Sequence, residues 1–372
     1  MTELATSAYQ PTEVSPPGET LREFLEERGL SQAELATRMG RPRKTISEVV
    51  SGKAAITHET ALQLELVTGI PAEFWNARER KYRAYLAALD ERHRLEKEAK
   101  WCARFPLNQM RKLGWIRGHS DKSGAVHELL SFLGVVSSEQ WEELYSQYAV
   151  AFRRPKNFAP DSYSLGAWLR RGLIESLAID TAPFDRERFT SVLTEARSLT
   201  RKPPGVFQPA LAAACAAAGV AIVFVPELPK SRASGATRWL TPEKALIQLS
   251  LRYRTNDHLW FTFFHEAAHI LLHGKKLIFI EVNSEGASVE EQEANEWAAN
   301  FLIPRLEYEA LLSSQPLDEQ VVSAFAAKIG IAPGIVVGRL QHDGHIPHNK
   351  LNWLKERLTW GDEPETVAGG AA

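Results

Sequence analysis

Apolar residues recur at helical spacing through most of the first 205 positions, whereas strand-like patterns appear only beyond them. Runs rich in apolar and β-branched residues, separated by turns that contain Pro or Gly, predict strands at 219–225, 235–240 and 245–251. Helical periodicity then returns at 258–273, 288–302, 317–329 and 333–342. The pattern therefore predicts a mainly α chain that ends in an α+β domain.

Breaks in this pattern predict how the chain is divided. Residues 1–17 and 361–372 have too few apolar residues to form a core, so we expect both ends to be disordered. Between them we expect a helical domain at 18–80 and a helical connector at 81–205, for which dimerisation and signal sensing are both open. An α+β domain should occupy 206–360.

The composition is that of a globular protein, with 372 residues, 44% hydrophobic and 24% charged, and a formal net charge of −2. Because the chain is not a polycation, any nucleic-acid-binding face must be local. Cys102 and Cys215 lie far apart, which fits a reducing compartment. No signal-peptide pattern is present, and the longest apolar run, 211–225, is shorter than the roughly 20 residues that a membrane span needs. These features predict a cytoplasmic protein without a membrane segment.

Two short helices joined by a tight turn are predicted near the N-terminus. Ser31 and Glu34 form a capping-box pattern that begins a helix at 31–39, and Gly40 ends it. Pro42 is suited to the first position of a second helix that runs through Val50. This arrangement is a helix-turn-helix, the plan by which many proteins place a helix in the DNA major groove.

The second helix combines a core-facing side with a side suited to DNA. Ile46, Val49 and Val50 share one face, and the residues left on or near the exposed face are Arg43, Lys44, Thr45, Ser47 and Glu48. Long cations and short hydroxyls are the side chains that contact phosphates and base edges. A small helical bundle with a solvated basic face is the alternative explanation of the same pattern.

The run SQAELATRMGRPRKTISEVVSGKAAIT, followed by ALQLELVTGIPAEFW, resembles the Xre family of helix-turn-helix repressors and is most similar to its HigA-type antitoxin branch. The resemblance implies a five-helix DNA-binding domain that acts as a homodimer on a palindromic, double-stranded operator. It also implies that Gln32 and the 43–48 face contact DNA. Arg41 and Pro42 depart from the family pattern, which leaves the angle of the second helix open.

The segment FTFFHEAAHILLH (261–273) carries an HExxH pattern. His265 and His269 lie one turn apart on a helix, a spacing that suits two ligands of one Zn²⁺ ion. Glu266 would lie beside the ion, where a carboxylate can take a proton from metal-bound water. The neighbouring residues are apolar almost all round the helix, so burial is expected, and a buried His-Glu-His set without partners would be unfavourable.

A third ligand is needed for a catalytic zinc site. His273 lies about 12 Å beyond His265 along a helix axis, so we expect it to be a bystander. The helix at 290–304 offers Glu291 and Glu293. We favour Glu291, because Asn295 would then lie one turn further on, where it can orient a ligand histidine. Glu293 stays open as the alternative.

The segments HEAAHILLH and EQEANEWAANFLIP resemble the ImmA/IrrE family of zinc metallo-endopeptidases, in order and in spacing. The resemblance implies a zincin-like domain with a small sheet packed on the HExxH helix. In it, His265, His269 and Glu291 are the zinc ligands and Glu266 is the general base. The strands at 235–240 and 245–251 are expected to form a sheet edge to which a peptide adds. Tyr253, Tyr308, His342 and His345 remain candidates for stabilising the oxyanion.

Two functions are compatible with the sequence. The first is a HigA-like transcriptional regulator whose zinc peptidase domain cleaves a regulatory protein, or the chain itself, to alter expression. The second is a non-catalytic antitoxin or repressor whose C-terminal domain binds a toxin partner or senses a signal. Glu266 favours the enzyme, because a purely structural metal site has no use for a carboxylate that is not a ligand.

Overall fold

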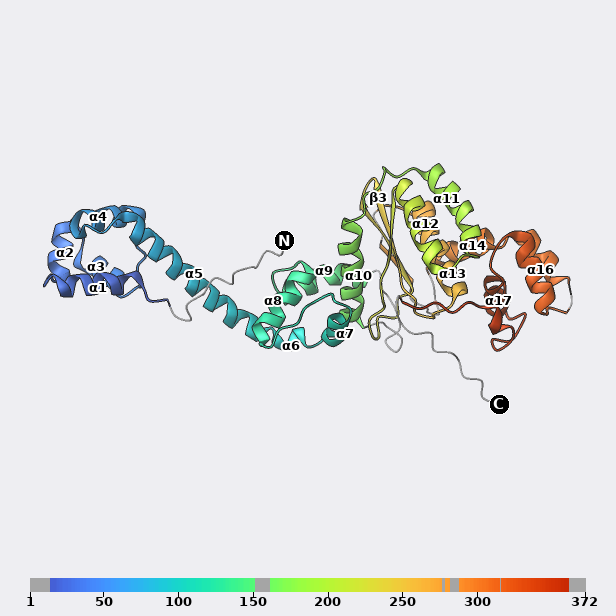
Figure 1. Cartoon of the computed structure of the whole chain (residues 1–372), viewed down its shortest axis with the longest axis horizontal. Coiled ribbons are helices and arrows are strands. Elements are labelled where there is room, and N and C mark those ends of the chain that lie inside the picture. The colour runs from blue at the N-terminus through green and yellow to red at the C-terminus, as the bar shows by residue number, and fades with distance from the viewer. Residues whose placement is uncertain (1–13, 151–160, 276–277, 282–287, 315, 361–372) are drawn as a thin grey trace. The chain divides into compact units, whose positions relative to one another are not determined.

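The computed structural model describes residues 14–150, 161–275, 278–281, 288–314 and 316–360, and Figure 1 shows it. The chain divides into two compact units, Met1–Lys97 and Glu98–Ala372. The described residues are mainly helical, with one small sheet in the second unit, so the predicted fold class is confirmed. Disorder is predicted for 1–17 and 361–372, of which 1–13 and 361–372 lie outside the described residues. Residues 14–17 are described, and Pro17 is buried at the start of α1. The domain boundaries drawn from the sequence stay predictions.

The first unit holds the five helices that the Xre resemblance implies. They are α1 (Pro17–Glu27), α2 (Gln32–Met39), α3 (Arg43–Val50), α4 (His58–Thr68) and α5 (Ala72–Lys97). Both helices of the predicted helix-turn-helix are confirmed as α2 and α3. The capping box is present, because the Glu34 amide donates to Ser31 Oγ over 3.2 Å and the Ser31 amide donates to Glu34 Oε2 over 2.9 Å. Gly40 ends α2 in the left-handed region, with a φ of 63°.

The core of this unit lies between α1, α2, α3 and α4. Leu21, Leu35, Ile46 and Leu64 are completely or almost completely buried there, and Trp75 closes the cluster from the start of α5. Gly18 contacts α3 so closely that a Cβ atom would lie 2.3 Å from the carbonyl oxygen of Val49. The position of α3 is therefore determined by its packing against α1 and α2.

The second unit begins with helices and continues into the sheet. Its first helices are α6 (Ala99–Cys102), α7 (Leu107–Lys112), α8 (Lys122–Leu133), α9 (Ser138–Val150), α10 (Ser162–Leu177), α11 (Arg186–Leu199) and α12 (Pro204–Ala217). The strands are β1 (Val220–Phe224), β2 (Gly235–Thr241), β3 (Lys244–Leu249) and β4 (Ile278–Glu281). The later helices are α13 (Asn256–Leu272), α14 (Val289–Leu302), α15 (Arg305–Leu312), α16 (Glu319–Ile329), α17 (Pro333–His342) and the 3₁₀ turn η1 (Asn352–Leu354).

The sheet is mixed, with strand order β1-β3-β2-β4. β1 pairs with β3 in parallel, while β2 runs antiparallel to both β3 and β4. The expectation that β2 and β3 form a free edge is therefore wrong, because β1 covers the outer side of β3 and β4 covers the outer side of β2. The short strand β4 was not predicted from the sequence.

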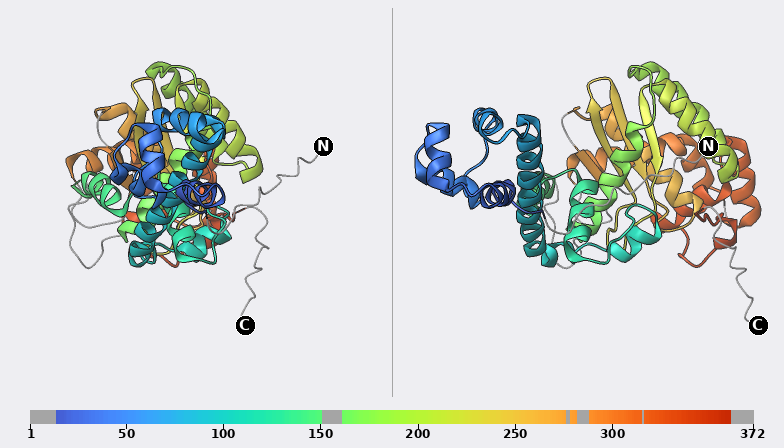
Figure 2. Two further views of the ribbon diagram at one scale, coloured as in Figure 1. Left: turned by 90° about the vertical axis from the view of Figure 1, so that its left-hand side faces the viewer. Right: turned by 60° about the vertical axis from the view of Figure 1, so that its left-hand side comes forward.

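Helices cover both faces of the sheet, as Figures 1 and 2 show. On one face lies α10, where the indole N–H of Trp168 donates to the carbonyl of Val225 over 3.1 Å and Gln248 Nε2 donates to the carbonyl of Trp168 over 2.7 Å. On the other face lie α12 and α13, and Thr237 Oγ1 of β2 donates to the carbonyl of Glu266 over 3.1 Å. The small sheet packs on the HExxH helix, as predicted.

Among the described residues, no single helix has both the length and the apolar character to cross a membrane. The pair α16 and α17 passes that test only when the two are taken together, and they are bent by 114°.

A core substitution should show how strongly the first unit depends on this packing. Leu35→Ala removes a completely buried side chain and should lower the free energy of unfolding by about 2–5 kcal/mol. Glu27→Ala, at an exposed position on α1, is the control and should change it by less than about 0.5 kcal/mol. Urea unfolding followed by far-UV circular dichroism measures both, and equal effects would contradict the packing described.

Candidate metal centre and DNA-contacting face

Three polar side chains lie inside the apolar helix α13. His265 and Glu266 are 0% exposed and His269 is 1% exposed. The residues beside them on the helix, Phe263, Phe264, Ala267 and Ala268, are completely buried as well, so the predicted burial of this helix is confirmed. Burying imidazoles and a carboxylate is unfavourable unless hydrogen bonds or a metal ion replace the lost water.

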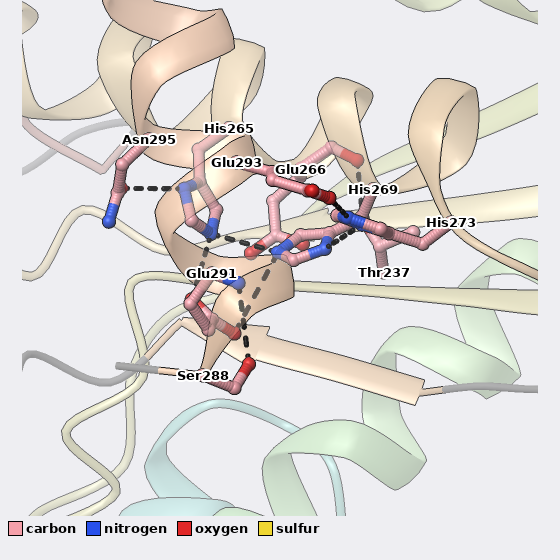
Figure 3. Close-up of polar contacts among 9 residues, drawn as sticks. All are labelled: Thr237, His265, Glu266, His269, His273, Ser288, Glu291, Glu293 and Asn295. Carbon is pink, nitrogen blue, oxygen red and sulfur yellow. Dashed lines mark hydrogen bonds and ion pairs between the residues drawn. The ribbon is translucent and has the colours of Figure 1, made fainter. Parts of the chain in front are cut away.

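Helix α14 brings a second carboxylate to these histidines. Its first turn is capped by Ser288 Oγ, which accepts from the Glu291 amide over 3.3 Å. Small buried residues on the face toward α13, Ala294, Ala298 and Ala299, allow the two helices to approach closely. Figure 3 shows the Glu291 carboxylate below the two imidazoles, 3.2 Å from His265 Nε2 and 3.7 Å from His269 Nε2.

The three donor groups have the spacing of a metal site. The two Nε2 atoms are 3.0 Å apart, and each lies near a carboxylate oxygen of Glu291. Ligand atoms at about 2.0–2.1 Å from a tetrahedral zinc ion are separated by roughly 3.3–3.4 Å. Two imidazoles and one carboxylate are also a donor set that zinc prefers, and they leave one position for water. The residues present therefore fit a catalytic divalent metal ion.

The protonation of His269 suits metal binding. Burial, with smaller contributions from the charges of His265 and His273, lowers the pKa of His269 to about 2. The ring is therefore neutral at physiological pH, and a neutral imidazole has the lone pair that a metal ion needs.

Asn295 lies where the sequence places it, one turn after Glu291. Its Oδ1 is 2.9 Å from Nδ1 of His265, and Figure 3 shows the amide behind the ring, on the side opposite Nε2. When Nδ1–H of His265 donates to the amide oxygen of Asn295, Nε2 is the ring nitrogen that carries the lone pair. This nitrogen faces Glu291.

The two candidates for the third ligand, Glu291 and Glu293, contact different histidines. Glu293 Oε2 is 3.2 Å from His273 Nε2 and belongs to another contact, whereas Glu291 faces both ligand histidines. The geometry supports Glu291. His273 is not among the three grouped ligand residues, as expected, although its Nδ1 lies 2.9 Å from Nδ1 of His269.

Strand β2 holds Glu266 from the other side of α13. The hydroxyl of Thr237 binds the Glu266 carbonyl, and an added Cβ at Gly235 would lie 2.5 Å from Glu266 Oε1 and 2.6 Å from Cγ2 of Thr262. Sequence analysis did not identify Gly235 or Thr237 as part of the site. The available signal was the glycine at the start of a predicted strand, which often marks a close approach of another group.

A cavity of about 880 Å³ opens beside the candidate metal centre. It begins at His265, Glu291 and Asn295 and extends past α15 and α17, where the lining includes Tyr308 and His342; Tyr253 lines it as well. Its volume is within the range of ligand and substrate sites in proteins. Of the four oxyanion candidates, Tyr253, Tyr308 and His342 line this cavity.

Tyr308 is held within a small polar network. Its hydroxyl donates to Asp343 Oδ2 over 2.9 Å, and Arg339 Nε donates to the same oxygen over 2.6 Å. Burial raises the pKa of Tyr308, and the hydrogen bond and charge of Asp343 raise it further. The phenol therefore stays protonated and able to donate a hydrogen bond.

The first unit carries the side chains predicted to contact DNA on one exposed face. Arg43, Lys44 and Ser47 are exposed on α3, and Thr45 and Gln32 are half-buried. Arg41 takes a different role, because its guanidinium pairs with Glu59 over 3.1 Å and donates to Gln63 over 2.5 Å. These two contacts join the turn before α3 to α4.

Comparisons with known proteins match the two units separately. Residues 21–75 match a family model described as helix-turn-helix, and residues 221–341 match a peptidase family model described as the IrrE N-terminal-like domain. The second match contains every residue of the candidate metal centre.

Among curated proteins, the chain is 37% identical over 59 residues to the uncharacterized HTH-type transcriptional regulator YddM of Escherichia coli K12. The match covers 16% of this chain and 63% of the length of that relative.

Two solved structures are similar to 23% of the chain. One is an addiction module antidote protein of the HigA family from Coxiella burnetii, 28% identical with 96% of that chain covered and a TM-score of 0.22. The other is the Pseudomonas aeruginosa antitoxin HigA with the higBA promoter, 29% identical with 95% covered and a TM-score of 0.22.

The close approach of β2 to Glu266 can be tested by adding one methyl group. Gly235→Ala should force Glu266 or Thr262 to move and should lower the free energy of unfolding by about 1–3 kcal/mol. Gly205→Ala, in the first turn of α12 with open space around the added carbon, is the matched control and should be neutral or slightly stabilising. Thermal unfolding of the full chain measures both, and equal stability of the two variants would contradict this packing.

Proposed function

We propose that the chain, which joins an Xre-type helix-turn-helix domain to an IrrE/ImmA-like domain, is a DNA-binding regulator that carries a zinc-dependent endopeptidase. The observation that supports the enzyme is the group formed by buried His265 and His269 with half-buried Glu291 on a second helix, with the Glu266 carboxylate on the same helix as the histidines. A structural zinc site is usually closed by a fourth protein ligand and has no use for a carboxylate such as Glu266 that is not a ligand.

In this proposal His265, His269 and Glu291 would hold Zn²⁺, which would supply Lewis-acid chemistry by lowering the pKa of a water molecule and polarising the peptide carbonyl. Glu266 accepts a proton on a carboxylate oxygen and returns it to the amine that leaves. Asn295 keeps the His265 ring oriented, and Gly235 leaves room for the carboxylate of Glu266.

The cavity beside His265 and Glu291 supports a polypeptide substrate. It extends from the candidate centre along α14 to α15 and α17, farther than the atoms around a single peptide bond need. Its lining combines charged, amide and apolar side chains, which suits an extended segment of mixed sequence. The substrate would be a regulatory protein or the DNA-binding half of this chain, either of which would alter expression when cut.

For the first unit we propose binding to double-stranded operator DNA through α3, with Arg43, Lys44, Thr45 and Ser47 on the contacting face and Gln32 at the start of α2. Exposed apolar side chains on α4 and α5, namely Leu62, Leu66 and Phe74, support self-association of this unit as a homodimer. A dimer would place two copies of α3 on the half-sites of a palindromic operator.

Three substitutions separate metal binding from chemistry. Glu266→Gln should retain zinc, because the residue is not among the proposed ligands, and should slow peptide cleavage on the order of 10²–10⁴-fold. Glu291→Ala should lose the metal, whereas Glu293→Ala should keep most of it. Metal content is measured by atomic emission, and cleavage is followed by intact-mass analysis of the incubated full chain and of the proteins encoded beside it. If zinc is bound and Glu266→Gln leaves every cleavage product unchanged, the domain is not a peptidase of this kind, and the non-catalytic antitoxin becomes the better account.

The DNA-binding face is tested by the double variant Arg43→Ala with Lys44→Ala. Its affinity for a duplex that spans the promoter of its own gene should fall at least about tenfold, and the slope of log K against log salt should decrease by about 1–2. Arg92→Ala with Arg94→Ala removes the same charge from α5 and should have a smaller effect. Fluorescence anisotropy over a range of salt concentrations measures both, and equal losses would indicate a non-specific charge effect.

A further inference from the structure

The last turn of α13 brings a third histidine back to the candidate metal centre. His273 ends the helix, and its Nδ1 lies 2.9 Å from Nδ1 of His269, on the side of the ring opposite Nε2. On its other side, His273 Nε2 is 3.2 Å from Oε2 of Glu293 on α14. Figure 3 shows the three residues in a row from His269 to Glu293. The His273 side chain is only 5% exposed, so the ring lies inside the protein while its carboxylate partner lies at the surface.

Counting protons along this row leads to one arrangement. A hydrogen bond between two Nδ1 atoms holds a single proton, so one ring donates and the other accepts. Because the Glu293 carboxylate accepts, the proton of neutral His273 is on Nε2, where it donates to that carboxylate. Nδ1 of His273 is then unprotonated, so it accepts the hydrogen bond from the Nδ1–H of His269. The row therefore favours the tautomer of His269 in which Nε2 faces Glu291 and His265.

We propose that His273 and Glu293 are positioning residues, which hold the His269 ring in the tautomer and orientation that bind the metal. Helix α14 would then orient both ligand histidines, His265 directly through Asn295 and His269 indirectly through Glu293 and His273. Partners behind the ligands of a metal site commonly contribute a factor of about 10–100 in metal affinity.

The two residues should contribute unequally. The Glu293 side chain is 57% exposed, so solvent screens its charge, and its contribution should come mainly from the oxygen that accepts from His273. His273 is buried against the ligand ring and should contribute more. A variant that keeps a hydrogen-bond acceptor at either position should therefore retain most of the metal affinity.

This inference rests on the proposed metal centre, so the experiment measures zinc affinity rather than peptide cleavage. All variants are made in the full chain that carries Glu266→Gln, and the zinc dissociation constant is measured by competition with a chromophoric chelator. His273→Phe keeps a ring without an acceptor and should weaken zinc binding about 10–100-fold, while His273→Gln should weaken it much less. Glu293→Ala should weaken binding more than Glu293→Gln does.

The matched control is Glu296→Ala, which removes another carboxylate from α14 and should leave the affinity nearly unchanged. The visible spectrum of the cobalt-loaded protein should keep its tetrahedral intensity in His273→Gln and change in His273→Phe. Urea unfolding of the metal-free proteins checks the fold. If His273→Phe does not fold, the comparison of Glu293→Ala, Glu293→Gln and Glu296→Ala, all on one helix, decides the question.

Several outcomes would overturn the inference while leaving the metal centre in place. The first is an unchanged zinc affinity in both His273→Phe and Glu293→Ala. The second is an equal loss of affinity in Glu293→Ala and Glu296→Ala. The third is a loss in His273→Phe as complete as that in Glu291→Ala, which would make His273 a ligand. Failure of the Glu266→Gln parent itself to bind zinc would instead reject the proposed metal centre.

Discussion

The burial of two imidazoles and a carboxylate within an apolar helix is the constraint on which the second unit depends. Water is excluded from His265, Glu266 and His269, so every hydrogen-bond donor and acceptor on them must be satisfied by protein or by a metal ion. Helix α14 supplies two such partners. The Glu291 carboxylate faces the Nε2 atoms of both histidines, and Asn295 contacts Nδ1 of His265. The same constraint explains why a short row of polar residues extends from His269 through His273 to the surface.

The close packing around α13 determines where these partners lie. Alanines on the facing side of α14 let the carboxylate of Glu291 come within 3.2 Å of an imidazole, and Gly235 lets β2 approach Glu266 without a side chain between them. The sheet that carries Gly235 is in turn held by α10, through Trp168 and Gln248 on its opposite face. Substitutions far from the histidines that move β2 or α14 are therefore expected to disturb the site.

The two units have opposite requirements for their polar side chains. The metal centre needs burial, because low solvent access keeps His269 neutral and its lone pair available. The DNA-contacting face needs exposure, and Arg43 and Lys44 project from α3 while Ile46 and Val49 anchor that helix in the core. In the proposed function, joining both in one chain would let a cleavage event change DNA binding.

The sequence by itself determined the helices that carry the predicted DNA-contacting residues, the helices of the candidate metal centre, and the chemistry of that centre. The capping box at Ser31, the left-handed Gly40 and the apolar periodicity specify α2, α3, α13 and α14 locally, because caps and helical faces depend on residues only a few positions apart. The HExxH spacing likewise places two histidines on one face of one helix without reference to the rest of the chain.

Only the tertiary structure decided the relations between elements. The expectation of a free edge at β2 and β3 was wrong because β4, a four-residue strand after α13, pairs with β2, and local patterns do not specify such pairings. The close approach of Gly235 to Glu266 and the contact of His273 with His269 were not predicted, for the same reason. The first depends on the contact of strand β2 with helix α13, and the second on the contact of the end of α13 with the ring of His269. Such contacts follow from packing rather than from spacing along the chain.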